Sequence, residues 1–473
     1  MANVDVITEA GPEVENKTGV LDPEHRDYLL SRHKTLELHP FPSRDPADPL
    51  NWPDWKKNLN LFLIAFHAMM TTFIAAGIIP AYELFVRDFG ITISQASYLT
   101  SAQVLILGLS PLFWKPVSDR WGRRPIWLIS TSCSMICNIG CAESRTYAAQ
   151  VVTRILVAFF ISPAIAISSV VVAETFFAEN RGQKMGIWTL MVTLGAPTGP
   201  FLLGFVAYAT DSWKWIYWIF AITNGVQCIA YFIFSPETLF AREGGVKLNK
   251  KRTFWHDRLN FRLGGQPHIV ASDFVSPLKL ASYPHIVIPA VAYAIVFNFA
   301  SILATVEIPQ IFTPKFEFNV QQIGLQFIGI IVGSLVGEVL GGLGSDQWMR
   351  YQHKRNTRSR KVTPEDRLWV DRLQSYNVTP VVGLGIAAFG NQVISTVLVT
   401  YAVDCHDELA ASIGVFINFV RSTWGFIGPF WFPYMFSSIG LSGSGGLMAG
   451  IIAMCAILPI MFIHWKGRAL RKK

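Results

Sequence analysis

Charged side chains are scarce in this chain. Asp, Glu, Lys and Arg make up only 15% of its 473 residues, whereas hydrophobic residues make up 51%. A soluble protein carries about a quarter of its residues as charges, so the composition excludes an ordinary soluble fold. The net charge of +8 does not indicate nucleic acid, because the basic residues fall in short clusters between apolar runs and form no single patch.

Other absences narrow the class of protein further. The first 57 residues contain no apolar segment typical of a secretory signal, so the first apolar run must itself direct membrane insertion. No Walker loop, HExxH motif or nucleophile elbow is present, so we expect neither an enzyme nor ATP as the energy source. Of only six cysteines, Cys133, Cys137 and Cys141 share one apolar run. Three thiols could hold a metal, but a fourth ligand and a polar surround are missing, so we expect small packing residues, no metal and no disulfide framework.

The apolar residues form long runs, as in a membrane protein that crosses the bilayer many times. A helix needs about 20 residues to cross about 30 Å of hydrocarbon. Eleven runs qualify as spans: 58–82, 94–117, 126–142, 148–173, 185–208, 213–235, 285–308, 321–345, 380–403, 409–435 and 443–464. They predict an all-α membrane protein with a tail (1–57), a six-helix bundle (58–236), a central loop (237–284), a second bundle (285–464) and a basic tail (465–473). The first tail is Pro-rich, and we expect it to be disordered up to about residue 48.

The basic residues indicate the orientation of these spans. With the N-terminus inside, 34 of the 40 Lys and Arg lie in cytoplasmic segments and four lie in outer loops. This asymmetry predicts that both tails and the central loop are cytoplasmic. Only Arg154 and Arg421 remain inside spans.

The turn between the second and third runs carries a specific motif. Asp119, Arg120, Gly122, Arg123 and Arg124 match the pattern Gly-x-x-x-Asp-Arg-x-Gly-Arg-Arg/Lys, with Lys115 in place of the first Gly. The chain therefore resembles the major facilitator superfamily, in particular its fungal drug:proton antiporter-like members with twelve spans. The resemblance implies two six-helix bundles related by a pseudo-two-fold repeat, and ion pairs at this turn that stabilise one conformational state.

An internal repeat is consistent with the resemblance. Ile79-Pro80 returns as Ile308-Pro309, and Gly199-Pro200-Phe201 returns as Gly428-Pro429-Phe430. Asp119 follows Gln95 by 24 residues, and Asp346 follows Gln322 by the same distance. We call the motif at 119–124 the gate motif, and Asp346 marks its second copy. The ninth span is not recognisable. It should begin soon after Asp346, but the segment 350–372 is dense with charge and cannot cross lipid. The segment 377–380 already resembles the lead-in to span ten. We therefore expect that span nine was lost from the gene model, because eleven spans would place the basic C-terminal tail outside.

Several polar residues inside spans are candidates for transport chemistry, because a titratable group at this depth is costly unless it faces protein or water. Arg154 lies in a stretch that resembles a span-four motif linked with proton coupling; alternatively it reaches the interface with its charged end. Glu307 either contacts substrate or protons at the outer mouth or is solvated, and Asn298 follows it on the same helix. Arg421 resembles a family position and needs a buried partner.

A second set of residues is expected to shape the helices. Gly195, Pro197, Gly199, Pro200 and Gly204 resemble the antiporter motif of span five; ordinary small-residue packing is the alternative. Three carboxylates are expected to be structural: Glu174 as a brace of the gate loop, Glu338 as a latch to an arginine rather than a proton carrier, and Asp404 at the inner face.

The resemblance implies a proton-coupled transporter that exports a small organic molecule, such as a toxin, drug or fungal secondary metabolite, by alternating access. The alternatives are an importer of a polyamine or other nutrient, and a sensor or inactive, span-deleted protein. We expect a monomer in the plasma membrane whose partners are substrate, protons and lipid, with no cofactor beyond the proton gradient. Asn377 is a glycosylation candidate, external only if span nine exists.

Overall fold

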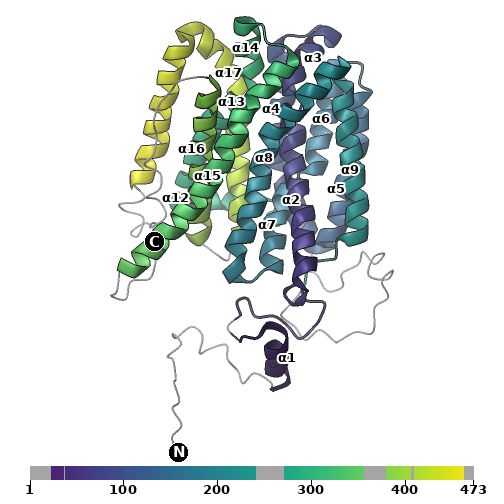
Figure 1. Ribbon diagram of the computed structural model, residues 1–473, viewed down its shortest axis with the longest axis vertical. Coiled ribbons are helices and arrows are strands. Elements are labelled where there is room, and N and C mark those ends of the chain that lie inside the picture. The colour runs from purple at the N-terminus through teal and green to yellow at the C-terminus, as the bar shows by residue number, and fades with distance from the viewer. Residues whose placement is uncertain (1–22, 37, 241–270, 356–379, 406–409, 463–473) are drawn as a thin grey trace, which may run out of the picture.

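The structure is a computed structural model that describes residues 23–36, 38–240, 271–355, 380–405 and 410–462. Helices pack side by side along the long axis of this part of the chain (Figure 1). Ten of the described helices are long and apolar enough to cross a bilayer. The expected span at 409–435 is helical as well, from Ala410 onward.

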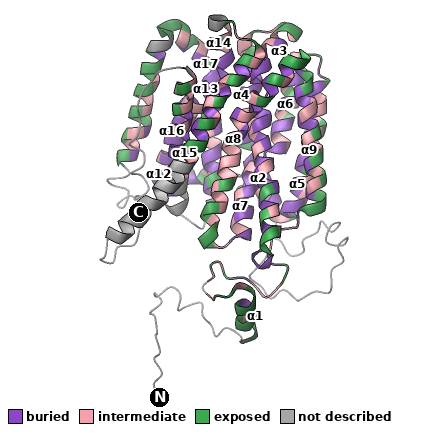
Figure 2. Ribbon diagram, viewed as in Figure 1, coloured by how far each residue is buried: buried purple, intermediate pink, exposed green. Residues whose placement is uncertain are grey.

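The first half contains six spans in the expected order. Their helices are α2 (Asp54–Ala76) with the short η2 (Ile79–Ala81) and α3 (Tyr82–Phe89), α4 (Ile93–Trp121), α5 (Arg123–Ala142), α6 (Tyr147–Ile161) with α7 (Pro163–Thr175), α8 (Ala178–Thr210) and α9 (Lys214–Phe234). Pro163 breaks span four because proline is favoured at the first position of a new helix. Figure 2 shows buried residues inside the bundle and exposed ones around it, as expected of helices whose outer faces meet lipid.

The second half begins after two short helices at the inner face, α11 (Ala271–Val275) and η3 (Ser276–Ser282). Span seven combines α12 (Pro284–Phe297), the π-helical turn η4 (Asn298–Ile302) and α13 (Leu303–Val306), and is followed by α14 (Ile308–Phe316). The remaining helices are α15 (Val320–Arg355), α16 (Pro380–Cys405), α17 (Ala410–Ile452) and the π-helical turn η7 (Ala453–Ile457). Gly440 has a φ of 68° inside α17 and splits it into two antiparallel spans.

Local structure confirms the repeat that the sequence predicts. Gln95 and Thr92 exchange side-chain and backbone hydrogen bonds at the start of α4, and Gln322 and Asn319 do the same before α15. Such reciprocal caps satisfy amide groups that the first turn of a helix leaves free. The two halves therefore start their second spans with the same device.

The direction of α16 bears on the missing span. Glycines of α15 contact the backbone of α16 in parallel register: Gly329 meets Val381, Gly333 meets Gly385, and Gly337 meets Phe389. The two helices lie side by side and run from the outer to the inner face (Figure 1). Arg355 and Pro380 therefore lie at opposite ends of the helix pair, as they would with a ninth span between them. The residues between them, 356–379, lie outside the described part of the chain, as do Asn377 and the tail 465–473.

The last span is poorly covered by other helices. In its most apolar 18 residues, within Gly443–Phe462, 11% are buried, against 39% for α9, the last span of the first half. In the first half, α9 packs along α5, the third span. Among the described residues the second half offers no counterpart of α5, which explains the exposed face of its last span.

The prediction of a disordered first tail is wrong for the described residues of that tail. Residues 23–33 form α1 (Pro23–His33), and Leu29 and Leu50 are fully buried. Arg32 donates to the Asn51 carbonyl at 2.8 Å, and the Ala178 amide donates to the His39 carbonyl at 2.8 Å. The segment therefore packs under the loop between spans four and five, because its few apolar side chains find a buried surface there.

Candidate functional site

The outer ends of the two halves are packed together. Gly204 of α8 and Gly324 of α15 approach so closely that a Cβ added to Gly204 would lie 3.1 Å from the Gly324 Cα atom. Tyr98 of α4 stacks on Phe430 of α17 with ring centroids 4.5 Å apart. These contacts join the halves along both sides of the interface and close the outer side.

The residues that resemble the antiporter motif form the packing surface of α8. A Cβ at Gly195 would collide with Met69 and Thr72 of α2, and one at Gly199 would lie 2.7 Å from the Phe73 carbonyl oxygen. Pro197 and Pro200 are buried in the same stretch. Gly195 and Gly199 therefore hold α8 against α2 within the first half, whereas Gly204 holds it against the second half.

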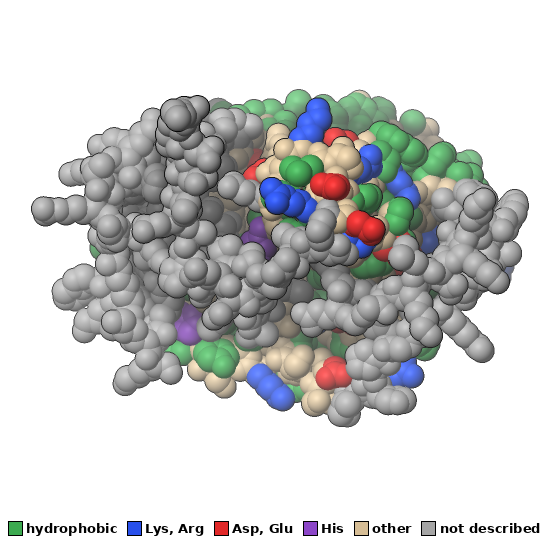
Figure 3. Space-filling view, turned by 90° about the horizontal axis from the view of Figure 1, so that it is seen from below, with side chains coloured by type: hydrophobic (Ala, Val, Ile, Leu, Met, Phe, Trp, Pro, Cys, Tyr) green, Lys and Arg blue, Asp and Glu red, His purple; other side chains and the backbone are tan. Residues whose placement is uncertain are grey.

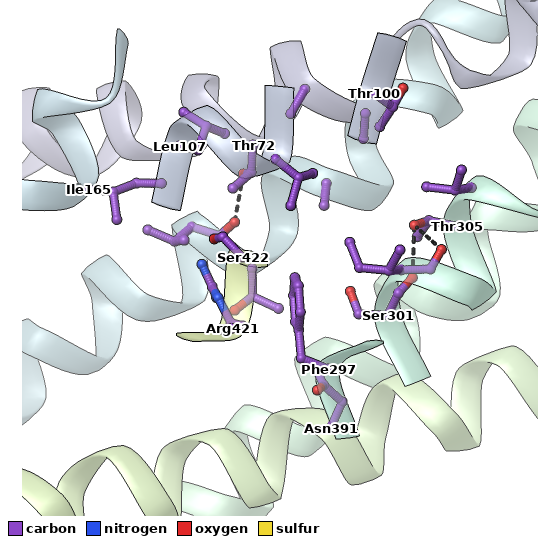
Figure 4. A pocket seen from close by; sticks show the side chains of 18 of the residues that line it. Thr72, Thr100, Leu107, Ile165, Phe297, Ser301, Thr305, Asn391, Arg421 and Ser422 are labelled. Atoms are coloured by element: carbon purple, nitrogen blue, oxygen red, sulfur yellow. Dashed lines mark hydrogen bonds between the residues drawn. The ribbon is translucent and has the colours of Figure 1, made fainter. Parts of the chain in front are cut away.

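A cavity lies between the halves, below these contacts. Its lining comes from spans one, two, four, five, seven, ten and eleven, and Figure 4 shows Thr72, Thr100, Phe297, Ser301, Asn391 and Arg421 around it. Its volume is about 100 Å³, whereas pockets for drug-sized ligands measure roughly 300–1,000 Å³. The halves must therefore separate to admit such a molecule. The sequence did not identify the threonines or Asn391, since isolated polar residues in apolar runs carry no motif.

Arg421 is the predicted candidate that lines this cavity. It donates to the Tyr293 hydroxyl at 3.1 Å and to the Asn418 side-chain oxygen at 2.7 Å. Its guanidinium lies 4.6 Å from the centroid of the Phe297 ring, within the range of a cation–π contact. Tyr293 and Asn418 are both buried, so Arg421 has the buried partners that the sequence predicts, and both are neutral.

Arg154 is completely buried in α6, which rules out the alternative that its charged end reaches the interface. It donates to the carbonyls of Ile74 and Ala75 at 3.1 and 3.0 Å. These carbonyls belong to the last turn of α2, where acceptors lack intrahelical partners and a cation is favoured by the helix dipole. The arginine thus caps the C-terminal end of span one.

Glu307 is also completely buried, between α13 and α14, so the alternative of a solvated carboxylate is wrong. Neither of its carboxyl oxygens has a hydrogen-bond partner among the described residues. On the same outer side, the Tyr82 hydroxyl donates to Thr100 at 2.7 Å.

Asn298 does not line the cavity. It begins the π-helical turn of span seven, is buried, and faces Gly428 of α17, where an added Cβ would lie 2.5 Å from the Asn298 side-chain oxygen. Turns of this kind often occur at functional sites. Its place indicates a contact between spans seven and eleven.

At the inner face the gate motif forms an ion-pair network within the first half. Arg123 is buried and donates to Asp119 at 2.6 Å and to Glu174 at 2.9 Å. Glu174 also accepts a bond from Thr238, so it lies where a brace of this loop was expected. Gly122 joins α4 to α5 with a φ of 95°, and Arg120 is half-buried with no ion pair among the described residues. Figure 3 views this face from below and shows acidic and basic side chains grouped on it.

Sequence reasoning missed Glu237 as part of this network. Its carboxylate accepts hydrogen bonds from the amides of Arg123 and Arg124 at 2.9 and 3.0 Å, and so caps the start of α5. Burial raises the pKa of Glu237, and these amide bonds and the Arg123 charge act in the opposite direction. The sequence Pro236-Glu237-Thr238, which follows the sixth span, was the available signal that could have pointed to Glu237.

The remaining carboxylates are only partly described. Glu338 of α15 accepts bonds from Gln392 and from Thr396 of α16, the latter at 3.2 Å, so the expected arginine partner is wrong for the described residues. The backbones of Asp346 and Asp404 lie in α15 and α16, but their side chains lie outside the description.

A bundle of membrane-spanning helices in two repeated halves, with a cavity between them, is the architecture of a membrane transporter. The family model of the Major Facilitator Superfamily matches residues 61–363. The chain therefore belongs to the Major Facilitator Superfamily, as its motifs predict, and it is a transporter and not an enzyme.

Known proteins similar to this chain agree with this assignment. "Efflux pump radE" from Floropilus chiversii is 28% identical over 458 residues, covering 90% of this chain and 83% of its own. "Multidrug transporter TPO3" from Candida glabrata is 25% identical over 500 residues, covering 98% and 75%. The human organic anion transporter MFSD10 (TETRAN) has the same fold, with a TM-score of 0.56 and 15% identity over 86% of this chain and 99% of its own.

The length of one alignment is informative about the missing span. The alignment with the Candida transporter extends over 500 positions, but this chain has 473 residues. At least 27 positions, the difference of the two numbers, therefore exist in the relative and have no counterpart here. A span needs about 20 residues, so the alignment leaves room for one.

Proposed function

We propose that this transporter exports a small organic molecule in exchange for protons, by alternating access. The observation that carries the proposal is the Glu307 carboxyl group. The repeat pairs Ile308-Pro309 with Ile79-Pro80, so Glu307 occupies the position of Ile78, and both side chains are 0% exposed. An apolar residue satisfies this position in the first half, so packing does not require a carboxyl group in the second.

A buried carboxyl that has no hydrogen-bond partner among the described residues suits proton exchange. Ionising it in this enclosed environment would cost several kcal/mol, so the neutral form is favoured while the outer side is closed. Opening the outer side would let water reach the group and remove that cost.

The export direction is supported by the relatives, since radE is named an efflux pump and TPO3 a multidrug transporter. Uptake of a polyamine is disfavoured, because the charged residue among those that line the cavity is the cation Arg421. A polycation would meet repulsion there without a compensating carboxylate.

Inside-out vesicles with an acidic lumen test the proposal. The purified chain should accumulate rhodamine 6G or 1-naphthalenesulfonate in the lumen when the pH gradient is imposed. Glu307→Gln, which keeps the shape of the neutral acid, should lose gradient-driven accumulation at least tenfold but retain exchange of labelled for unlabelled probe at equal pH. Glu83→Gln, on the half-buried start of α3, is the matched control and should retain both activities. Full accumulation by Glu307→Gln, or no accumulation of either probe by the native chain, contradicts the proposal.

A further inference from the structure

The charge balance of the central cavity indicates what kind of molecule it binds. Among the lining residues Arg421 is the one charged side chain, and the others are apolar or carry neutral groups such as the hydroxyls of Ser301 and Thr305 and the amide of Asn391. In the close-up view the Arg421 side chain lies beside this space together with Phe297 (Figure 4). The cavity therefore has a net positive lining.

Arg421 differs in its surroundings from the buried arginines Arg123 and Arg154. Arg123 pairs with two carboxylates, and Arg154 binds carbonyls at a helix end. Arg421 is partly exposed beside the cavity and has two neutral partners, and its Nε atom, like those of the other two arginines, has none among the described residues. A guanidinium has five donors, so this one retains donors for a further acceptor.

The neighbours of Arg421 are suited to complete an anion site. The Tyr293 hydroxyl accepts the bond from Arg421, so its own proton is free to be donated to a bound group. Phe297 offers an aromatic face next to the charge, and Val104, Leu107 and Ile302 supply apolar surface. Arg421 is only partly exposed and has no counter-ion among the described residues, so an anion that pairs with it recovers part of the cost of its incomplete hydration.

We propose that the transported molecule is an organic anion: an apolar or aromatic body that carries a carboxylate, sulfonate or similarly acidic group, which pairs with Arg421 and accepts a hydrogen bond from Tyr293. This inference rests on the proposed transport function and names its substrate class. Asn418 holds the guanidinium in place and itself donates to the Leu107 carbonyl of α4 at 3.0 Å. The charge therefore lies where spans two and eleven meet.

Paired probes of the same shape test this proposal by binding alone. The purified chain in nanodiscs is titrated with 1-naphthalenesulfonate and with neutral 1-naphthalenesulfonamide, and thermal stabilisation gives each affinity. We expect the sulfonate to bind at least about tenfold more tightly, which corresponds to about 1.4 kcal/mol. Arg421→Gln should bind both probes equally, with the affinity for the sulfonamide unchanged. Arg421→Lys should keep part of the preference, because it retains the charge without the planar fork.

Ser422→Ala is the matched control, since Ser422 lines the same cavity and the change removes a hydroxyl but no charge. It should keep the full preference for the sulfonate. Equal affinity of the native chain for the two probes, no binding of either, or a preference that survives in Arg421→Gln would overturn the proposal. Binding requires no pH gradient, so a chain that prefers the sulfonate but shows no gradient-driven transport would refute the proposed function and leave this inference intact.

Discussion

Gly204→Ala is predicted to open the outer side of the transporter. The added Cβ would lie 3.1 Å from the Gly324 Cα atom and 3.2 Å from the Val320 carbonyl oxygen. Both atoms belong to the backbone of α15, so no side chain can move aside to make room. Forcing an extra methyl group into such a contact costs about 1–3 kcal/mol. Because the contact joins the two halves, only the state with a closed outer side bears this cost.

A cost of about 1–3 kcal/mol to one of two states shifts their ratio about 5- to 150-fold. The shift can be measured with a single cysteine at Val306, which is 1% exposed on the outer part of span seven. In a background without the six native cysteines, a membrane-impermeant maleimide added outside should label Val306→Cys faster by that factor when Gly204→Ala is present.

Two other glycines separate this effect from loss of stability. Gly195→Ala also introduces a collision, but with α2 in the same half, so it should lower the thermal stability without raising the labelling rate. An added Cβ at Gly182 meets nothing within 4 Å, so Gly182→Ala should change neither quantity. A folded Gly204→Ala protein with an unchanged labelling rate would refute the reasoning.

Three further predictions concern the ion-pair network at the inner face, the buried Arg154 and the missing span. Arg123→Gln should lower the free energy of unfolding by about 3 kcal/mol in chemical denaturation, because it leaves two carboxylates without their shared cation. Arg120→Gln should change that free energy by less than about 0.5 kcal/mol, and similar losses in both variants would contradict the role of Arg123 as the centre of the network. Arg154→Gln should abolish proton-driven flux at normal expression, and intact flux would show that Arg154 has no coupling role. Sequencing the transcript between the codons of Arg355 and Pro380 should reveal an in-frame apolar stretch of about 20–25 residues, whereas a transcript that encodes the chain as given would refute the loss of a span from the gene model.

The bilayer explains why so much of the fold could be predicted from sequence. Lipid offers no hydrogen bonds to the backbone, so apolar runs of sufficient length must be helices, and their number, order and orientation follow from hydropathy and from Lys and Arg counts. The repeat was visible because Ile-Pro and Gly-Pro pairs serve the same local geometry in both halves. The gate motif was identified because its turn needs Gly122 and a dense group of charges.

The roles of single polar residues depended on tertiary structure. Sequence left Arg154 with two alternatives, and the carbonyl groups that bury it come from residues 79 and 80 positions earlier in the chain. Glu307 was expected either at the outer mouth or in solvent, and only the packing of the helices shows it enclosed, with no hydrogen-bond partner among the described residues. Hydropathy describes which residues can lie in the membrane but not which of them face one another.

The same distinction applies to the whole chain. By itself the sequence determined the class of protein and the placement of its helices, and it predicts the side of the membrane for most loops, because these depend on local composition and on the cost of charge in lipid. Tertiary structure decided that α16 runs parallel to α15, that Glu237 caps α5, and that Arg421 is the one charged side chain among the described residues that line the central cavity. Each of these results depends on contacts between distant segments, which arise only when the helices pack.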